Sequence, residues 1–223
     1  MTPPRQRGLS LVELMIGLAI GLFIVATATS LLLDRIREHR ALLIESRLMQ
    51  DLRTAADLVS RDLRRAGYWG ESTAGLPRGG AAAAANPYTA LAPAAAASDA
   101  VSFRFSRDAG ENHAVDGNEQ FGFRLRRGVI EMLLGSGNWQ ALTDSGTMIV
   151  TAFSVTPRVD EITLQALCEK ACAAGAADCP PKQQLRSFGV AITGRSSADA
   201  GVVRGVRSQV RLRNDVIVGA CPA

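Results

Sequence analysis

The chain has 223 residues, of which 25 are lysine or arginine and 21 are aspartate or glutamate, so its formal net charge is +4 at pH 7. This length is enough to bury a core, and it predicts one domain plus a membrane segment. The modest net charge excludes the dense basic surface of a dedicated nucleic-acid binder. Because only 5% of the residues are aromatic, we expect a core made mostly of aliphatic side chains.

The amino-terminal segment has the pattern of a membrane helix. Residues 1–8 contain two arginines and no acidic residue, which keeps this end cytoplasmic by the positive-inside rule. Residues 9–33 are apolar or small except for Glu13, and they are long enough to cross a hydrocarbon core of about 30 Å. A charge at the bilayer centre is unfavourable by about 2.5–3.5 kcal/mol, so Glu13 should have a partner. No lysine or arginine lies between residues 7 and 35, so we expect the helix itself to supply none within reach.

The stretch RGLSLVELMIGLAIGL resembles the class III signal of type IV pilins and type II secretion pseudopilins. The resemblance implies that a prepilin peptidase cuts after Gly8 and methylates the new amino terminus at Leu9, where phenylalanine is commoner in the family. Glu13 would then be the fifth mature residue, whose expected partner is the terminal amine of a neighbouring subunit in the filament. Gly17 and Gly21 form a G-x-x-x-G motif that permits close helix packing. A simple membrane anchor with an interfacial glutamate is the alternative.

Residues 34–67 are predicted to continue the helix as an amphipathic half. Apolar residues recur at steps of three and four, which draws one stripe along a helix and predicts packing on a domain. The stripe consists of Leu48, Leu52, Ala55, Val59, Leu63 and Ala66. Gly67 follows two arginines and is a natural helix stop.

Residues 68–100 are rich in alanine, glycine and proline, and the prolines interrupt every helical run. We interpret this segment as a long surface loop, with a helical turn expected at Ala81–Ala85.

From residue 101 the apolar period changes to two, which predicts strands. The expected strands are 101–106, 121–126, 128–134, 147–155, 161–167, 187–194 and 205–214. Arg127-Gly128 is expected to close a tight hairpin, and residues 108–120 a longer one. Short turns between successive strands favour an antiparallel sheet over 101–223. The predicted fold class is therefore α+β and type IV pilin-like, with the long amino-terminal helix packed on an antiparallel β-sheet.

The four cysteines are Cys168, Cys172, Cys179 and Cys221. An even number in an oxidising periplasm predicts two disulfides, with three possible connectivities. We favour a bond from Cys221 to one of the other three, which would hold the carboxyl terminus on the sheet, and a second bond between the remaining two. The spacing C-x3-C-x6-C does not match the usual zinc arrangements, so no metal is expected.

No catalytic motif is present: G-x-S-x-G, H-E-x-x-H and phosphate-binding glycine loops are all missing from the sequence. We therefore expect no enzyme and no cofactor. Acidic and amide side chains gather at residues 108–119, and we interpret them as solvated turn residues rather than a calcium site. Arg207, Arg211 and Arg213 fall on the polar phase of a strand, with Arg204 just before, and are interpreted as a solvated face rather than a DNA-binding patch.

The stretches 123–144 and 206–214 resemble the sheet of PilW-type minor pilins and the related minor pseudopilin J. The resemblance implies a minor pilin that helps to initiate or cap type IV pilus assembly. Its expected partners are other minor pilins, the major pilin, the prepilin peptidase and the inner membrane, with the carboxyl-terminal domain in the periplasm. A type II secretion minor pseudopilin is the first alternative. A membrane-anchored periplasmic binding module or adhesin is the second.

Overall fold

The computed structural model describes residues 10–75, 84–107 and 110–222, and the chain divides into two compact units, 1–44 and 45–223. The longest element is helix α1, Leu11–Leu63, with 53 residues. In the first unit, every described side chain from residue 10 to residue 43 is exposed. The long uninterrupted helix follows from the sequence, because no proline interrupts the segment.

In the second unit, the helix buries one face. Five members of the predicted stripe are buried residues of the helix, and the sixth, Ala66, is buried in the turn that follows; each is at most 4% exposed: Leu48, Leu52, Ala55, Val59, Leu63 and Ala66. The helix ends at Leu63, and the turn that follows it closes at Gly67, whose φ of 76° lies in the left-handed region that glycine tolerates best. The predicted packing of the long helix on antiparallel strands is confirmed, but residues 34–43 of the predicted amphipathic half are exposed and the buried face begins at Leu48.

The first sheet contains five antiparallel strands in chain order. They are β1 (Leu91–Ala92), β2 (Ala100–Arg104), β3 (Gln120–Arg126), β4 (Val129–Leu134) and β5 (Trp139–Ala141). The predicted hairpin at Arg127-Gly128 is confirmed: both residues have positive φ, 51° and 78°, as the tightest hairpin turns require.

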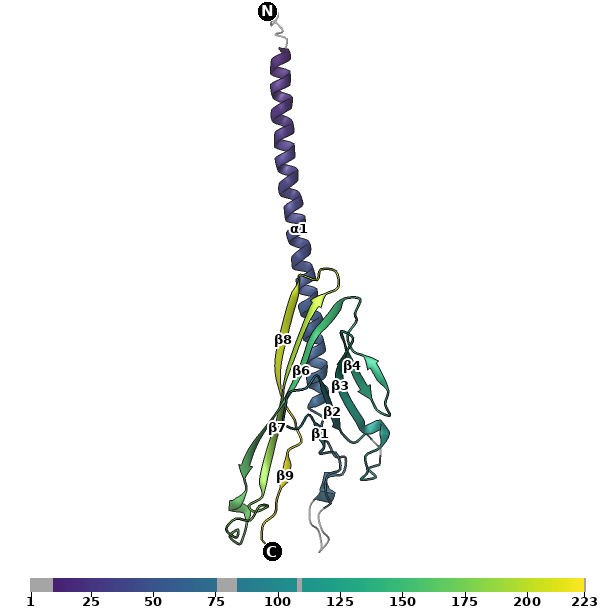
Figure 1. The fold of residues 1–223 in the computed structure, drawn as a ribbon, viewed down its shortest axis with the longest axis vertical. Helices are drawn as coiled ribbons and strands as arrows, with labels where there is room; N and C mark the ends of the chain where they lie inside the picture. Colours follow the sequence, from purple (N-terminus) through teal and green to yellow (C-terminus); the bar gives the residue numbers. More distant parts are fainter. Residues whose placement is uncertain (1–9, 76–83, 108–109, 223) are drawn as a thin grey trace, which may run out of the picture. The chain divides into compact units, whose positions relative to one another are not determined.

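The second sheet has the order β6-β7-β8, and β9 pairs with the other end of β7. Its strands are β6 (Met148–Thr163), β7 (Lys182–Ser196), β8 (Val203–Arg211) and β9 (Val216–Val218), all paired antiparallel. In Figure 1 these long strands lie beside the helix, next to the shorter strands of the first sheet.

Two details of the predicted sheet are wrong. The strands form two sheets instead of one, and the expected strand 161–167 does not exist as a separate element. Its first residues finish β6 at Thr163, and Gln165–Leu167 is a 3₁₀ helix. The strands that the sequence reading missed, β1, β5 and β9, have only two or three residues, which is too short for an alternating pattern to appear.

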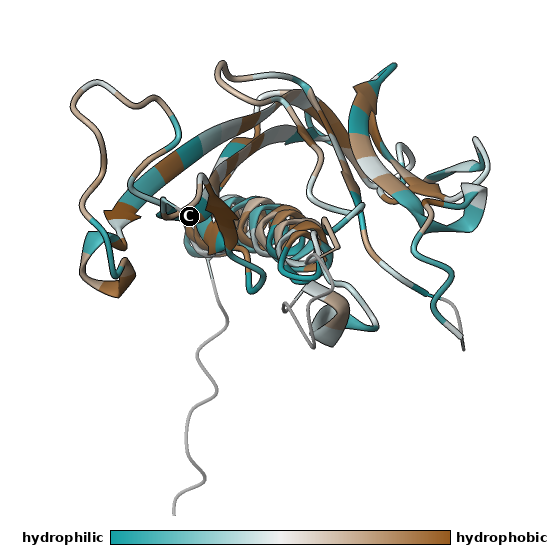
Figure 2. Ribbon diagram, turned by 90° about the horizontal axis from the view of Figure 1, so that it is seen from below, coloured by the Kyte–Doolittle hydropathy of each residue, from teal (hydrophilic) through white to brown (hydrophobic). Residues whose placement is uncertain are grey.

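The core lies between the helix and the two sheets. Figure 2 shows the sheets curved over the helix in the second unit, with hydrophobic residues on the strands. Most core residues are aliphatic, as expected. Phenylalanines are concentrated on β2, β3 and the segment between them, where Phe103, Phe105, Phe121 and Phe123 stack at centroid distances of 3.9–6.2 Å.

The described parts of segment 68–100 contain more regular structure than the predicted surface loop. It contains the 3₁₀ helix Ser72–Gly75 and strand β1, and Tyr88 is fully buried. The helical turn expected at Ala81–Ala85 falls largely outside the described residues. Tyr88 is buried because its hydroxyl finds polar partners inside the fold, which lowers the cost of burying it.

Candidate functional site

The predicted cleavage site, Gly8 and Leu9, lies outside the described residues. The described chain begins at Ser10, immediately before the helix. The backbone amide of Ser10 donates a hydrogen bond to Oε2 of Glu13 at 3.0 Å, and the Ser10 hydroxyl accepts one from the amide of Val12 at 3.3 Å. Ser-x-x-Glu at a helix start with these two bonds is a variant of the capping box, in which the Ser10 hydroxyl caps the second helical amide instead of the third, and each side chain satisfies a backbone donor that the helix leaves free.

This arrangement corrects one sequence-based expectation. The helix was expected to offer Glu13 no partner within reach, but the backbone amide of Ser10 is such a partner. The expectation considered only cationic side chains. The capping-box signal, serine followed three residues later by glutamate, was present in the sequence and could have predicted the bond. A neutral amide leaves the charge of Glu13 without a counter-ion within the described part of the first unit.

The other polar side chains of the apolar segment are satisfied within the helix. The hydroxyls of Thr27, Thr29 and Ser30 donate to helix carbonyls three or four residues earlier, at 2.7–3.1 Å. Hydroxyls paired in this way are compatible with a hydrocarbon environment. Glu13 is therefore the side chain of this segment whose charge still needs a partner.

The helix surface around the two predicted packing glycines is open. A Cβ added at Gly17 or at Gly21 would meet nothing within 4 Å. The described part of this chain therefore does not require glycine at either position, which leaves both free for the close approach of another helix. The large apolar side chains from Leu11 to Leu33 are exposed, and by length and composition α1 can cross a membrane.

The structure joins the four predicted cysteines in two pairs. Cys168 is bonded to Cys221, at a sequence separation of 53 positions and with 5.3 Å between their Cα atoms. Cys172 is bonded to Cys179 across a short loop. Since Cys221 follows β9, the first bond holds the carboxyl-terminal strand close to the segment after β6.

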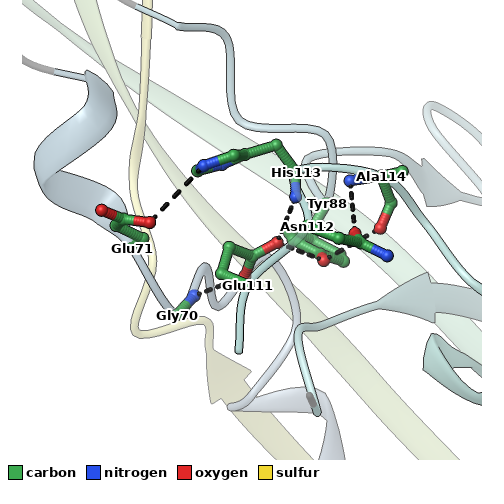
Figure 3. A network of polar contacts seen from close by, with 7 residues as sticks. All are labelled: Gly70, Glu71, Tyr88, Glu111, Asn112, His113 and Ala114. Carbon is green, nitrogen blue, oxygen red and sulfur yellow. Dashed lines mark hydrogen bonds and ion pairs between the residues drawn. The ribbon is translucent and has the colours of Figure 1, made fainter. Parts of the chain in front are cut away.

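Sequence reasoning missed a buried polar network around Tyr88. The Tyr88 hydroxyl lies 2.8 Å from Oε1 of Glu111 and 3.1 Å from Oε2 of Glu119. Figure 3 shows Glu111 also accepting hydrogen bonds from the amides of Gly70 and His113. The network thus joins the segment that follows α1 to the loop between β2 and β3.

The network also corrects the interpretation of the acidic loop. Glu119 is fully buried rather than solvated, because the amides of Arg107 and Asp116 donate to its carboxylate at 2.9 and 3.0 Å. Partial burial raises the pKa of Glu111, but hydrogen bonds from Ser106, Tyr88, His113 and Gly70 outweigh it and hold that pKa below its ordinary value. Among the described residues, no group of three or more histidine, cysteine or acidic side chains could hold a metal ion.

Comparison with known protein families places these features in context. Residues 41–212 match the family model of prepilin peptidase-dependent protein B, and residues 3–29 match the prokaryotic N-terminal methylation motif. No curated protein and no solved structure matches the chain significantly. Pilin-like families are generally structural, and the methylation motif followed by an apolar helix indicates membrane anchoring. Because the first match covers more than half of the chain, this chain belongs to the family of prepilin peptidase-dependent protein B and is a type IV pilin-like protein.

Proposed function

We propose that the chain is a minor pilin of the PilW type, which helps to initiate or cap type IV pilus assembly by docking with other minor pilins and the major pilin in the inner membrane. The observation that supports this proposal best is Glu13, a carboxylate in an apolar exposed helix whose partner in its own chain is a neutral amide. Such a group suits a subunit that meets a cation only when it assembles.

The cation would be the amine of Leu9 on a neighbouring subunit, which exists only after cleavage at Gly8. Near the membrane interface, water and headgroups make the Glu13 charge tolerable. Packing into a helix bundle removes that solvation, and an ammonium group in contact offsets the loss. The exposed glycines Gly17 and Gly21 would let the neighbouring helix approach closely enough for the two charges to meet.

The test uses cells that lack the gene and are complemented with wild-type protein or with Gly8→Val. Intact-mass analysis should find a wild-type chain that starts at Leu9, whereas Gly8→Val should keep residues 1–8, because a branched side chain obstructs the peptidase. Surface pili should be counted in both strains, together with secretion of a type II substrate. Restored pili with wild-type protein alone would support the proposal.

Two results would reassign the protein. Restored secretion with unchanged pilus numbers would make it a minor pseudopilin related to pseudopilin J. An uncut chain that still restores pili would exclude processing after Gly8 and favour a plain membrane anchor.

A further inference from the structure

A groove rich in arginine lies in the second unit, at the carboxyl-terminal end of α1. Two adjoining cavities of about 290 Å³ and 470 Å³ share Arg64 and Arg213 in their walls. Arg65, Tyr68 and Asn214 complete much of the first cavity, and Arg211 lines the second. Among the described residues, no aspartate or glutamate lines either cavity. We call this surface the basic groove.

Two of these arginine side chains form no ion pair or hydrogen bond within the described part of the fold. The last carbonyls of the helix already have donors: the amide of Arg213 bonds to the carbonyl of Arg64 at 3.2 Å, and the Asn214 side chain bonds to that of Ala66 at 3.0 Å. Arg65 lies over the ring of Phe105 at 4.1 Å, and Arg211 pairs with Asp215 at 3.1 Å.

The guanidinium groups of Arg64 and Arg213 are exposed, and within the described part of the chain neither has an ion pair or a side-chain hydrogen bond. Arginine at the end of a helix complements the dipole, which accounts for Arg64 in part. It does not account for Arg213, which follows the end of β8. Two unpaired cations that converge on one groove from different elements point to an external anion.

The shape and charge of the groove favour carboxylates on a polypeptide. A guanidinium binds a carboxylate or a phosphate through two parallel hydrogen bonds. Nucleic-acid surfaces track a phosphate backbone with a long basic stripe and usually several stacking aromatics. Here the cations are confined to one groove and Asp215 pairs with Arg211. Among the described residues, Tyr68, 49% exposed, is the one aromatic side chain that lines the groove.

We propose that the basic groove docks an acidic segment of a neighbouring filament subunit, with Arg64 and Arg213 as the residues that bind its carboxylates. This inference rests on the proposed assembly function. It adds a second contact, made by the folded domain, to the contact proposed for Glu13.

The test measures binding to the full-length protein in a neutral detergent. Fluorescein-labelled octaglutamate and a labelled oligothymidylate of equal charge serve as probes, and fluorescence anisotropy gives each Kd at low ionic strength. The variant Arg64→Gln/Arg213→Gln is compared with wild type and with Arg53→Gln/Arg126→Gln. This control removes the same charge from two exposed arginines outside the groove.

We expect the groove variant to bind octaglutamate about tenfold more weakly or worse, because it loses two exposed charge pairs that each contribute up to roughly fivefold. The control variant should stay close to wild type. Equal losses in both variants would mean unspecific attraction and would overturn the proposal. Tighter groove-dependent binding of oligothymidylate would overturn it in favour of nucleic acid. Because the assay requires no pilus, these results are independent of cleavage after Gly8 and of pilus counts.

Discussion

Glu13 and Glu119 show how far single residues could be predicted. Both occupy the third position of a capping box, and the patterns Ser10-x-x-Glu13 and Asp116-x-x-Glu119 are visible in the sequence. The contact of Glu119 with Tyr88 was not predictable, because it joins residues 31 positions apart that only the folded chain brings together. Local signals therefore predict the caps, and tertiary packing decides which of them is buried.

The network around Glu111 makes stability depend on pH. The pKa of Glu111 is lower in the folded state than in the unfolded chain, where it is about 4.3. The hydrogen bonds to its carboxylate therefore stabilise the fold fully above that value, and this contribution is lost as the pH falls through the folded pKa. We expect Glu111→Gln to be less stable than wild type at pH 7 by about 1 kcal/mol.

The measurement is urea unfolding of the full-length protein in detergent from pH 7 to pH 3. The two stability curves should converge on acidification, because protonated Glu111 and glutamine are both neutral. A constant gap over the whole range would show that the charge of Glu111 contributes nothing. His113→Asn is a useful control, because it removes the 3.5 Å contact with Glu71 but keeps the amide that bonds to Glu111.

Helices and strands could be predicted where the pattern of apolar residues extends over many positions. The apolar stripe of α1 and the alternation of β7 run through enough residues to define a face, and both were identified from sequence. The division into two sheets depends on which strand edges meet: β5 ends the first sheet and β6 starts the second. No local pattern contains that information, since alternation along a strand shows which face is buried and not which strand is its neighbour.

The two disulfides should differ in their effect on stability. In the chain-entropy model a bond contributes more when it closes a longer loop, and the separations are 53 residues for Cys168–Cys221 and 7 for Cys172–Cys179. We expect Cys168→Ser/Cys221→Ser to lose about 2 kcal/mol more stability than Cys172→Ser/Cys179→Ser. Thermal unfolding of both variants, and of wild type under reducing conditions, gives the comparison. Equal losses would assign the effect to local packing.

At the scale of the whole molecule, the two units differ in which side chains they bury. Every buried core residue lies at position 48 or later, so the second unit builds its core without residues 1–44. The first unit exposes a continuous set of large apolar side chains and contains Glu13. A change at Glu13 should therefore alter assembly without altering the folding of the domain.

Glutamine at position 13 separates the capping bond that the structure shows from the ion pair that we propose. Glu13→Gln keeps an oxygen that can accept from the Ser10 amide, so the capping box and the helix start should persist. It removes the charge that we propose pairs with the amine of Leu9 on a neighbour. We expect normal membrane insertion, leader cleavage and domain stability, but few surface pili and weak crosslinking to other pilins.

Ser10→Ala is the converse variant, because it removes the hydroxyl that caps Val12 and keeps the Glu13 charge. It should weaken the helix start by about 1 kcal/mol and leave the number of pili close to wild type. If Glu13→Gln cells instead make normal pili while Ser10→Ala cells do not, Glu13 acts as a helix cap and the intersubunit ion pair is excluded. The loss of pili in Glu13→Gln alone would establish that assembly needs the charge, because the hydrogen-bond acceptor is still present.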